Sequence, residues 1–238
     1  MPTPIITVKN LVKKYGNFTA VNGISFEVNP GEIFGLLGPN GAGKSTTLEI
    51  IETLREKTSG EIWVNGLSID DAPEAIKKII GVQLQTAGFY PNLTLTELII
   101  LFVGLYQTEI DPLSLLKKVN LSDKANAKFK QLSGGQKQRF SIATTLINKP
   151  TIVFLDEPTT GVDPVSRKEF WDMLKRLQQT GITILVSTPY MDEAALCDRI
   201  AFIQNGSILE IDTPKAIVKH FSKTLYNISA DNMYQLIE

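Results

Sequence analysis

The sequence predicts an α/β protein built around a mostly parallel β-sheet. Three short and nearly continuous apolar runs have the length of strands that are buried on both faces: Ile33–Leu37, Ile152–Leu155 and Ile182–Val186. Segments with helical spacing separate these runs, as the crossover connections of a parallel sheet require. The chain has 238 residues, 43% of them hydrophobic, so we expect one domain of generous size with a real core.

Smaller antiparallel elements are predicted as well. Residues Ile24–Val28 alternate apolar and polar side chains, as a half-buried strand does. Asn65-Gly66 follows the apolar run Ile62–Val64, and Asn205-Gly206 separates two further apolar runs. Asn-Gly between apolar runs is a strong signal for a hairpin turn, so both places are expected to be antiparallel pairs.

The middle of the chain is predicted to be a helical insertion. Thr94–Tyr106, Asp111–Val119 and Ser133–Ile147 all have helical spacing. We therefore expect a single domain over residues 1–238, with an inserted helical subdomain at about residues 86–150. The C-terminal tail, residues 215–238, is only moderately patterned.

Charge and hydropathy exclude several classes of protein. Lysine and arginine number 24 and acidic residues 25, and this near balance argues against a nucleic-acid-binding protein. The longest apolar run, Leu98–Tyr106, is too short to span a membrane, and the N-terminus lacks the pattern of a signal peptide. A lone cysteine, Cys197, fits a reducing compartment. The sequence therefore indicates a soluble globular chain.

A glycine-rich segment after the first buried run fits the phosphate-binding loop, or P-loop. Glycines let backbone N–H groups point at phosphate oxygens, and the following helix directs the positive end of its dipole to the same point. Lys44 is expected to reach the β- and γ-phosphates, and the Ser45 hydroxyl to help hold Mg²⁺. The predicted nucleotide-binding residues of this segment are Gly38, Pro39, Asn40, Gly41, Ala42, Gly43, Lys44, Ser45 and Thr46.

Two acids, Asp156 and Glu157, end the buried run that begins at Ile152. Adjacent carboxylates at the end of an apolar strand repel each other unless a cation lies nearby. We expect Asp156 to hold the Mg²⁺ of a nucleotide, and Glu157 to orient or deprotonate the water that attacks the γ-phosphate. Without the P-loop upstream, a solvated strand end would be an equally good interpretation of this pair.

Between these motifs lies Leu132-Ser133-Gly134-Gly135-Gln136, which resembles the signature motif of the ATP-binding cassette (ABC) ATPases. The motifs occur in the order found in that family, and the resemblance covers nearly the whole chain. It implies a P-loop NTPase core with a mostly parallel sheet, an N-terminal antiparallel β subdomain and an inserted α-helical subdomain. It also implies an ATPase whose cofactors are ATP and Mg²⁺.

The signature segment has a physical interpretation of its own. Ser133 before an apolar-periodic stretch predicts a helix N-cap, and the helix start forms a second anion site. In the family, two cassettes pack head to tail, and the signature of one covers the nucleotide on the P-loop of the other. The resemblance therefore assigns nucleotide contacts to Ser133, Gly134, Gly135 and Gln136 of a partner cassette, which is either identical or related. Asp163, in Gly161-Val162-Asp163, would also contact the other subunit.

Two further residues are assigned by the resemblance. Tyr15, in Lys14-Tyr15-Gly16, matches the aromatic residue on which the family stacks adenine; on its own it would read as a tyrosine at a strand end. Gln85 matches the glutamine that links the metal site to the helical subdomain, and it is counted among the catalytic and metal-binding residues. Its neighbour Gln83 is the alternative, although the spacing from Gly81 favours Gln85.

One position departs from the family pattern. The family normally has a histidine that hydrogen-bonds the γ-phosphate where this chain has Pro189, and the register is supported by the following residues 190–194. Proline has no side-chain donor and no backbone N–H. The only histidine, His220, lies in the tail and is not expected to substitute. We therefore expect nucleotide binding with weak hydrolysis.

Residues 188–194 and 81–85 look most like those of drug- and lipid-type exporter cassettes. This implies transmembrane permease partners, a location on the cytoplasmic face of the cell membrane, and no nucleic-acid partner. The segment Phe89–Tyr106 is the candidate for contact with the permease, with helix core as an equal alternative.

Two functions stay open. Glu157 favours a transport motor, whereas Pro189 favours an ATP-gated dimerisation module with negligible turnover beside a competent cassette. A non-transport ABC ATPase is a weaker alternative, because the chain shows neither a long coiled coil nor a basic linker. The sequence also leaves open whether the chain is one half of a tandem-cassette protein.

Overall fold

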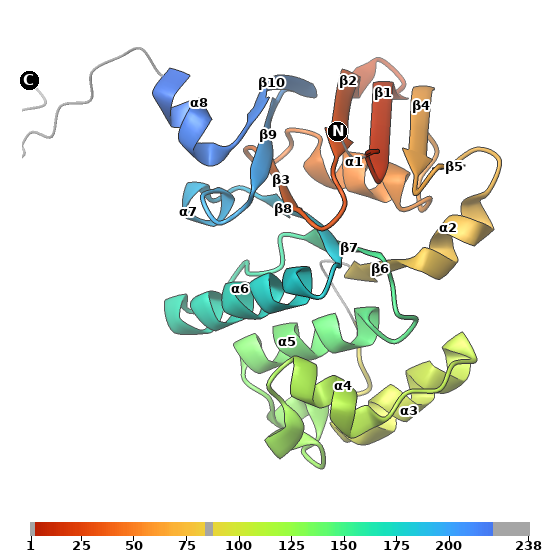
Figure 1. Ribbon diagram of the computed structural model, residues 1–238, viewed down its shortest axis with the longest axis vertical. Helices are drawn as coiled ribbons and strands as arrows, with labels where there is room; N and C mark the ends of the chain where they lie inside the picture. Colours follow the sequence, from red (N-terminus) through yellow and green to blue (C-terminus); the bar gives the residue numbers. More distant parts are fainter. Residues whose placement is uncertain (1–2, 84–87, 221–238) are drawn as a thin grey trace, which may run out of the picture.

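The computed structural model of the chain describes residues 3–83 and 88–220. Its strands form two sheets (Figure 1). The first is antiparallel, in the order β2-β1-β4-β5, and contains β1 (Ile6–Tyr15), β2 (Phe18–Val28), β4 (Ser59–Val64) and β5 (Leu67–Ser68). The predicted N-terminal antiparallel subdomain is thus confirmed.

The second sheet is the mostly parallel one that the apolar runs predict. Its order is β10-β9-β3-β8-β7-β6. It contains β3 (Ile33–Leu37), β6 (Ile80–Gln83), β7 (Ile152–Asp156), β8 (Thr183–Thr188), β9 (Arg199–Gln204) and β10 (Ser207–Asp212). Only β10 pairs antiparallel, with β9, across the predicted Asn205-Gly206 turn.

Apolar side chains bury both faces of this sheet, which explains why its strands are continuous apolar runs. In β3, Ile33 and Leu37 belong to the core that includes the helical insertion. Phe34 and Leu36 belong to a second core, which includes residues of the antiparallel sheet. The strand that leads to the P-loop therefore separates two hydrophobic cores.

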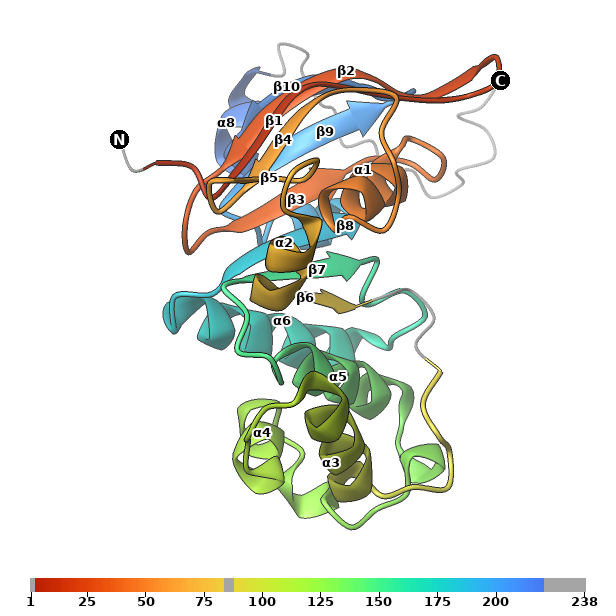
Figure 2. The same ribbon diagram turned by 90° about the vertical axis from the view of Figure 1, so that its right-hand side faces the viewer.

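The helices lie around these sheets as Figure 2 shows. They are α1 (Lys44–Ile51), α2 (Pro73–Ile79), α3 (Leu95–Tyr106), α4 (Pro112–Lys118), α5 (Gly134–Thr145), α6 (Pro164–Gln179), α7 (Met191–Ala194) and α8 (Pro214–His220). Two short 3₁₀ helices cover Ser122–Lys124 and Phe129–Gln131. In the described parts of the chain, no helix is both long and apolar enough to cross a bilayer.

Side-chain caps define where the three predicted helices begin. Thr94, Asp111 and Ser133 each accept a hydrogen bond from a backbone N–H of the first turn. Helices α3, α4 and α5 lie together at the end of the molecule away from the antiparallel sheet (Figures 1 and 2). The limits of a helical subdomain at residues 86–150, and the role of a tail at residues 215–238, stay predictions.

Candidate functional site

The P-loop connects the buried strand β3 to helix α1, as predicted. Gly43 has φ +102°, and a Cβ at this position would lie 2.5 Å from the backbone oxygen of Ala20. Both constraints require glycine immediately before the first helical residue, Lys44. The loop is thus shaped by its own backbone and by close contact with β2.

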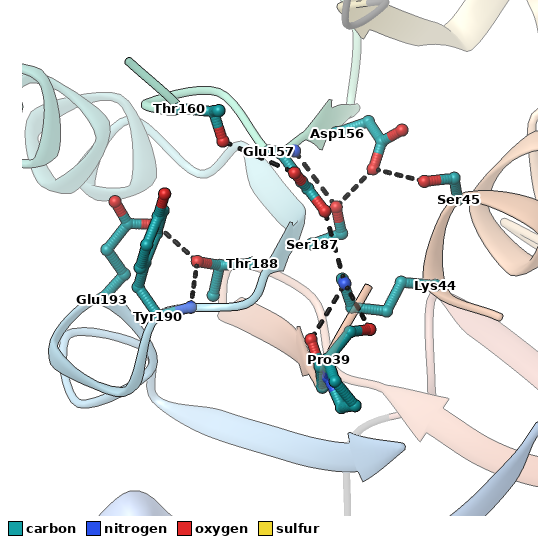
Figure 3. A network of polar contacts seen from close by, with 11 residues as sticks. Pro39, Lys44, Ser45, Asp156, Glu157, Thr160, Ser187, Thr188, Tyr190 and Glu193 are labelled. Atoms are coloured by element: carbon teal, nitrogen blue, oxygen red, sulfur yellow. Dashed lines mark hydrogen bonds and ion pairs between the residues drawn. The ribbon is translucent and has the colours of Figure 1, made fainter. Parts of the chain in front are cut away.

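Lys44 lies in the centre of this loop with only 3% of its surface exposed. Its Nζ donates hydrogen bonds to the backbone oxygens of Gly38, at 2.9 Å, and Pro39, at 3.1 Å. It also lies 3.3 Å from Oε1 of Glu157 (Figure 3). An almost fully buried ammonium group with these contacts is positioned to bind an anion that enters the loop.

Asp156 and Ser45 meet across the same site. The Ser45 hydroxyl donates a hydrogen bond to Oδ1 of Asp156 at 3.1 Å. A second hydroxyl, that of Ser187 on β8, donates to the same oxygen. Strands β7 and β8 pair in parallel with Asp156 opposite Ser187. A carboxylate beside a serine hydroxyl is the donor set that Mg²⁺ prefers, so these residues fit the predicted metal.

Glu157 follows β7 in the left-handed region, with φ +46°. Its backbone N–H donates to the Ser187 backbone oxygen at 3.2 Å and to the Ser187 hydroxyl at 3.1 Å. The Thr160 hydroxyl donates to Oε2 at 3.4 Å. This conformation, uncommon for a residue with a side chain, turns Glu157 away from the direction of Asp156 and toward Lys44.

A cavity of about 320 Å³ lies at the P-loop, beside these groups. Its lining residues are Tyr15, Phe18, Ala20, Asn40, Gly41, Gly43, Lys44, Ser45, Thr46 and Glu157. Eight of these belong to the predicted set, and the structure brings them together at one cavity. Phe18 and Ala20 were not predicted; the signal available was their position just after the hairpin turn that follows Tyr15.

Tyr15 lies at the end of β1, opposite Phe18 in the antiparallel pair. Nη1 of Arg55 donates to the Tyr15 hydroxyl oxygen at 2.7 Å, and Nε of Arg55 donates to Glu49 at 2.5 Å. Glu49 is part of α1, so the tyrosine is connected to the helix that begins at the P-loop.

Glu52, at the C-terminal end of α1, is a buried acid near the predicted metal carboxylate. Burial, followed by the negative charges of Asp156 and Glu49, raises its pKa from 4.5 to about 8. A neutral carboxyl group is the form that this environment favours.

The signature residues lie elsewhere. Ser133 accepts a hydrogen bond from the backbone N–H of Gln136 at 3.2 Å, and the Gln136 side chain accepts from the backbone N–H of Ser133 at 2.9 Å. This reciprocal pair forms the N-terminus of α5. A Cβ at Gly135 would lie 2.5 Å from the Cβ of Ser166, whereas a Cβ at Gly134 would meet no atom of the described residues within 4 Å. None of the four lines the cavity at the P-loop.

Asp163 is the N-cap of α6, where its Oδ1 accepts a hydrogen bond from the backbone N–H of Ser166 at 2.9 Å. That hydrogen bond holds the pKa of the Asp163 carboxyl below its usual value. Gln85 lies outside the described residues. Its neighbour Gln83 is described: its Nε2 donates to Gln138 of α5 at 2.8 Å, which links β6 to the signature helix.

Pro189 directly follows β8, at the same edge of the sheet as Asp156. Buried polar contacts fix the residues around it. The Thr188 hydroxyl donates to Glu193 at 2.6 Å and accepts from the backbone N–H of Tyr190 at 3.0 Å. The Thr159 hydroxyl also donates to Glu193, which connects this segment to the loop after Glu157.

The chain is similar in sequence to a known family and to several named proteins. Residues 21–160 match the family model described as ABC transporter. The chain is 39% identical over 215 residues to the probable multidrug ABC transporter ATP-binding protein YbhF of Escherichia coli, covering 88% of this chain but only 37% of YbhF. It is equally similar to the linearmycin resistance ATP-binding protein LnrL of Bacillus subtilis, covering 88% of this chain and 69% of LnrL. A Nod factor export ATP-binding protein I of Burkholderia lata is 38% identical, with coverage of 92% and 74%.

Solved structures have the same fold. The dimeric structure of the bacterial ABC transporter cassette MJ0796 superposes with a TM-score of 0.77 and 31% identity, covering 88% of this chain and 98% of that one. The ADP conformation of the cassette MJ1267 superposes with a TM-score of 0.83, covering 92% of this chain and 96% of that one, but at 24% identity this likeness concerns the fold alone.

Proposed function

The chain belongs to the ABC transporter family, as its motifs predicted, and from this premise we propose that it is the ATP-binding and ATP-hydrolysing motor subunit of an exporter. The observation that carries this proposal is the P-loop cavity, at which Lys44 pairs with Glu157 and Ser45 donates a hydrogen bond to Asp156. The export direction is supported by relatives named for multidrug transport, linearmycin resistance and Nod factor export. The chain spans 37% of the length of YbhF.

The predicted residues at this site have distinct roles in the proposal. Lys44 and the backbone N–H groups of the loop bind the β- and γ-phosphates, and the ring of Tyr15 stacks on adenine. Ser45, Asp156 and the predicted Gln85 hold Mg²⁺, which when bound neutralises phosphate charge. Glu157, whose Oε1 is next to Lys44, positions the attacking water and accepts its proton.

A second cassette completes the nucleotide site in this proposal. The helix start at Ser133 has exposed N–H groups but takes no part in the chain's own cavity. Close packing on Ser166 explains Gly135, but no atom of residues 3–83 and 88–220 lies within 4 Å of a Cβ placed at Gly134. A phosphate approaching from outside accounts for that open position. The dimeric structure of the cassette MJ0796 supports the pairing of two cassettes. In this proposal Asp163 also contacts the partner.

Transmembrane permease subunits are the other proposed partners, which places the chain at the cytoplasmic face of a membrane. Helix α3 buries Leu95, Leu98 and Ile99 toward the core. Its outer side exposes Ile100 and, at 70%, Leu105. The predicted contact segment therefore contains both core residues and an apolar outer face, and the latter is the part we assign to the permease.

A second function is favoured by one observation, the proline at position 189. No side-chain donor follows β8 at that point, so one positioned contact to the γ-phosphate is missing. The chain would then act as a dimerisation module that ATP closes, with negligible turnover, beside a competent cassette. Single-turnover hydrolysis separates this function from that of a motor.

The test uses purified protein with Mg·ATP. If the chain is a motor, wild type binds ATP and hydrolyses it in a single turnover. Lys44→Ala should lose most of the affinity for ATP, because it removes a buried cation. Lys57→Ala, which removes an ammonium group paired with Asp70 outside the cavity, is the matched control. If Lys44→Ala binds ATP as tightly as that control does, the proposed nucleotide site is wrong. If wild type binds ATP but hydrolyses no faster than Glu157→Gln, the dimerisation module is the function.

A further inference from the structure

Ser187 is a serine of β8 that is completely buried beside both strand-end acids. Its hydroxyl donates a hydrogen bond to Oδ1 of Asp156 and accepts one from the backbone N–H of Glu157 at 3.1 Å. A hydroxyl has a single proton, which is committed to Asp156. One side chain thus contacts the acid expected to hold the metal and the backbone of the acid expected to act as base.

The first contact determines how Asp156 is oriented. Both hydroxyls, those of Ser45 and Ser187, donate to Oδ1. Among the described residues, no hydrogen bond reaches Oδ2, and Figure 3 shows this oxygen pointing away from both serines. The carboxylate is therefore held from one side, and its other oxygen is left to a cation.

The second contact supports the backbone of Glu157. A left-handed conformation, here with φ +46°, costs free energy in a residue with a side chain and persists only where its surroundings hold it. Ser187 provides two acceptors to the same N–H, its hydroxyl and its backbone oxygen. Removal of the hydroxyl leaves the backbone oxygen, at 3.2 Å, as the remaining acceptor.

We propose that Ser187 is a positioning residue of this site, which aligns Asp156 for the metal and Glu157 for water through one hydroxyl. The proposal rests on the proposed ATPase function, because the metal arrives with the nucleotide. Ser187 itself is not expected to contact the metal or the attacking water. Its effect passes through the two acids, so metal affinity is the property that its removal changes most directly.

The experiment measures Mn²⁺ as a spectroscopic probe of the metal site. Binding of Mn²⁺ in the presence of ATP is followed by electron paramagnetic resonance for wild type, Ser187→Ala and Ser187→Thr. Loss of a hydrogen-bonded group beside a metal ligand typically weakens metal binding by about 10–100-fold, and we expect this for Ser187→Ala. Ser187→Thr keeps the hydroxyl and should retain most of the affinity. The Kd for ATP in EDTA should be unchanged, which also verifies that the variants fold.

Thr183→Val is the matched control, because it removes another buried hydroxyl at the opposite end of the same strand, one that accepts from the backbone N–H of Gly31. If Ser187→Ala binds Mn²⁺ as tightly as wild type does, the role of Ser187 in holding Asp156 is wrong. If its turnover at saturating Mg²⁺ equals that of the control, the role toward Glu157 is wrong. If wild type itself fails to bind Mn²⁺ with ATP, the proposed ATPase function fails instead.

Discussion

The Nζ of Lys44 and the Oε1 of Glu157 lie 3.3 Å apart in a site where both side chains are largely buried. The cation expected to bind phosphate is therefore already paired with the carboxylate expected to activate water. Nucleotide phosphates that enter the loop would share Lys44 with this carboxylate, and negative charge would accumulate unless Mg²⁺ arrives with them. The pair thus couples phosphate binding to the position of the base.

Replacing Glu157 by glutamine should separate binding from hydrolysis. Glutamine keeps the size of the side chain but cannot accept a proton, so we expect turnover to fall about 10²–10⁴-fold. The Kd for ATP should stay the same or decrease, because Lys44 no longer has a charged partner. Single-turnover hydrolysis and equilibrium binding measure the two effects. Glu169→Gln, which removes a carboxylate paired with Arg139 away from the cavity, should leave both unchanged.

The proline at position 189 should limit the rate of hydrolysis. Pro189→His supplies a side-chain donor directly after β8, and one positioned transition-state donor is worth about 10²–10³-fold in rate. Pro189→Ala also removes the ring but adds no side-chain donor, so it should stay slow. Turnover numbers at saturating Mg·ATP are measured for wild type and for both variants. Equal acceleration in both variants would mean that the ring, and not the missing donor, restrains the reaction.

Glu52 should make the nucleotide-free protein less stable as pH rises. Between 4.5, its ordinary pKa, and about 8, the folded protein retains a proton that the unfolded chain releases. The free energy of unfolding therefore falls across this window, by at most about 1.4 kcal/mol for each pH unit from this group.

Urea denaturation at pH 5.5, 7 and 8.5 measures this dependence. Glu52→Gln has no proton to lose and should show a flatter profile than wild type. Glu74→Gln, which removes an exposed carboxylate paired with Lys77 that does not act on Glu52, is the comparison and should keep the wild-type profile. Parallel profiles for wild type and Glu52→Gln would contradict the raised pKa.

Ser133 should have two separable roles. Ser133→Ala loses the cap of α5 and should cost about 1 kcal/mol of stability. Ser133→Asp keeps a good cap but places a negative charge where the partner's phosphate is expected. Both variants should bind ATP as monomers, and Ser133→Asp should not dimerise even though it is stable. Light scattering with Mg·ATP in a Glu157→Gln background tests this. If Ser133→Asp still forms a stable dimer, the predicted role of Ser133 in the interface is wrong.

The elements predicted best are those whose signals are local. The strand Ile33–Leu37 has the predicted bounds, because the turn residues on either side of this short apolar run fix where the strand begins and ends. The caps at Thr94, Asp111 and Ser133 are local signals too. The strand Ile6–Tyr15 was not predicted, because irregular pairing with β2 breaks the alternation of its side chains.

The helix Pro164–Gln179 was also missed, although its signal was present. Asp163 was interpreted only as a contact with another subunit, whereas Asp followed by Pro is also a strong helix start. The site residue that sequence reasoning could not find is Ser187. Its place beside Asp156 depends on the register of β7 and β8, and only the pairing of the two strands reveals it.

The position of β3 between two apolar cores determines the order in which parts of the protein unfold. Every side chain of this strand is buried, whereas the N-terminus of α5 is held by surface hydrogen bonds. Amide hydrogens of β3 should therefore exchange only in global unfolding, and those at the start of α5 in small local openings. As the concentration of denaturant is raised, the protein should therefore lose its ability to form dimers before it loses its ability to bind nucleotide.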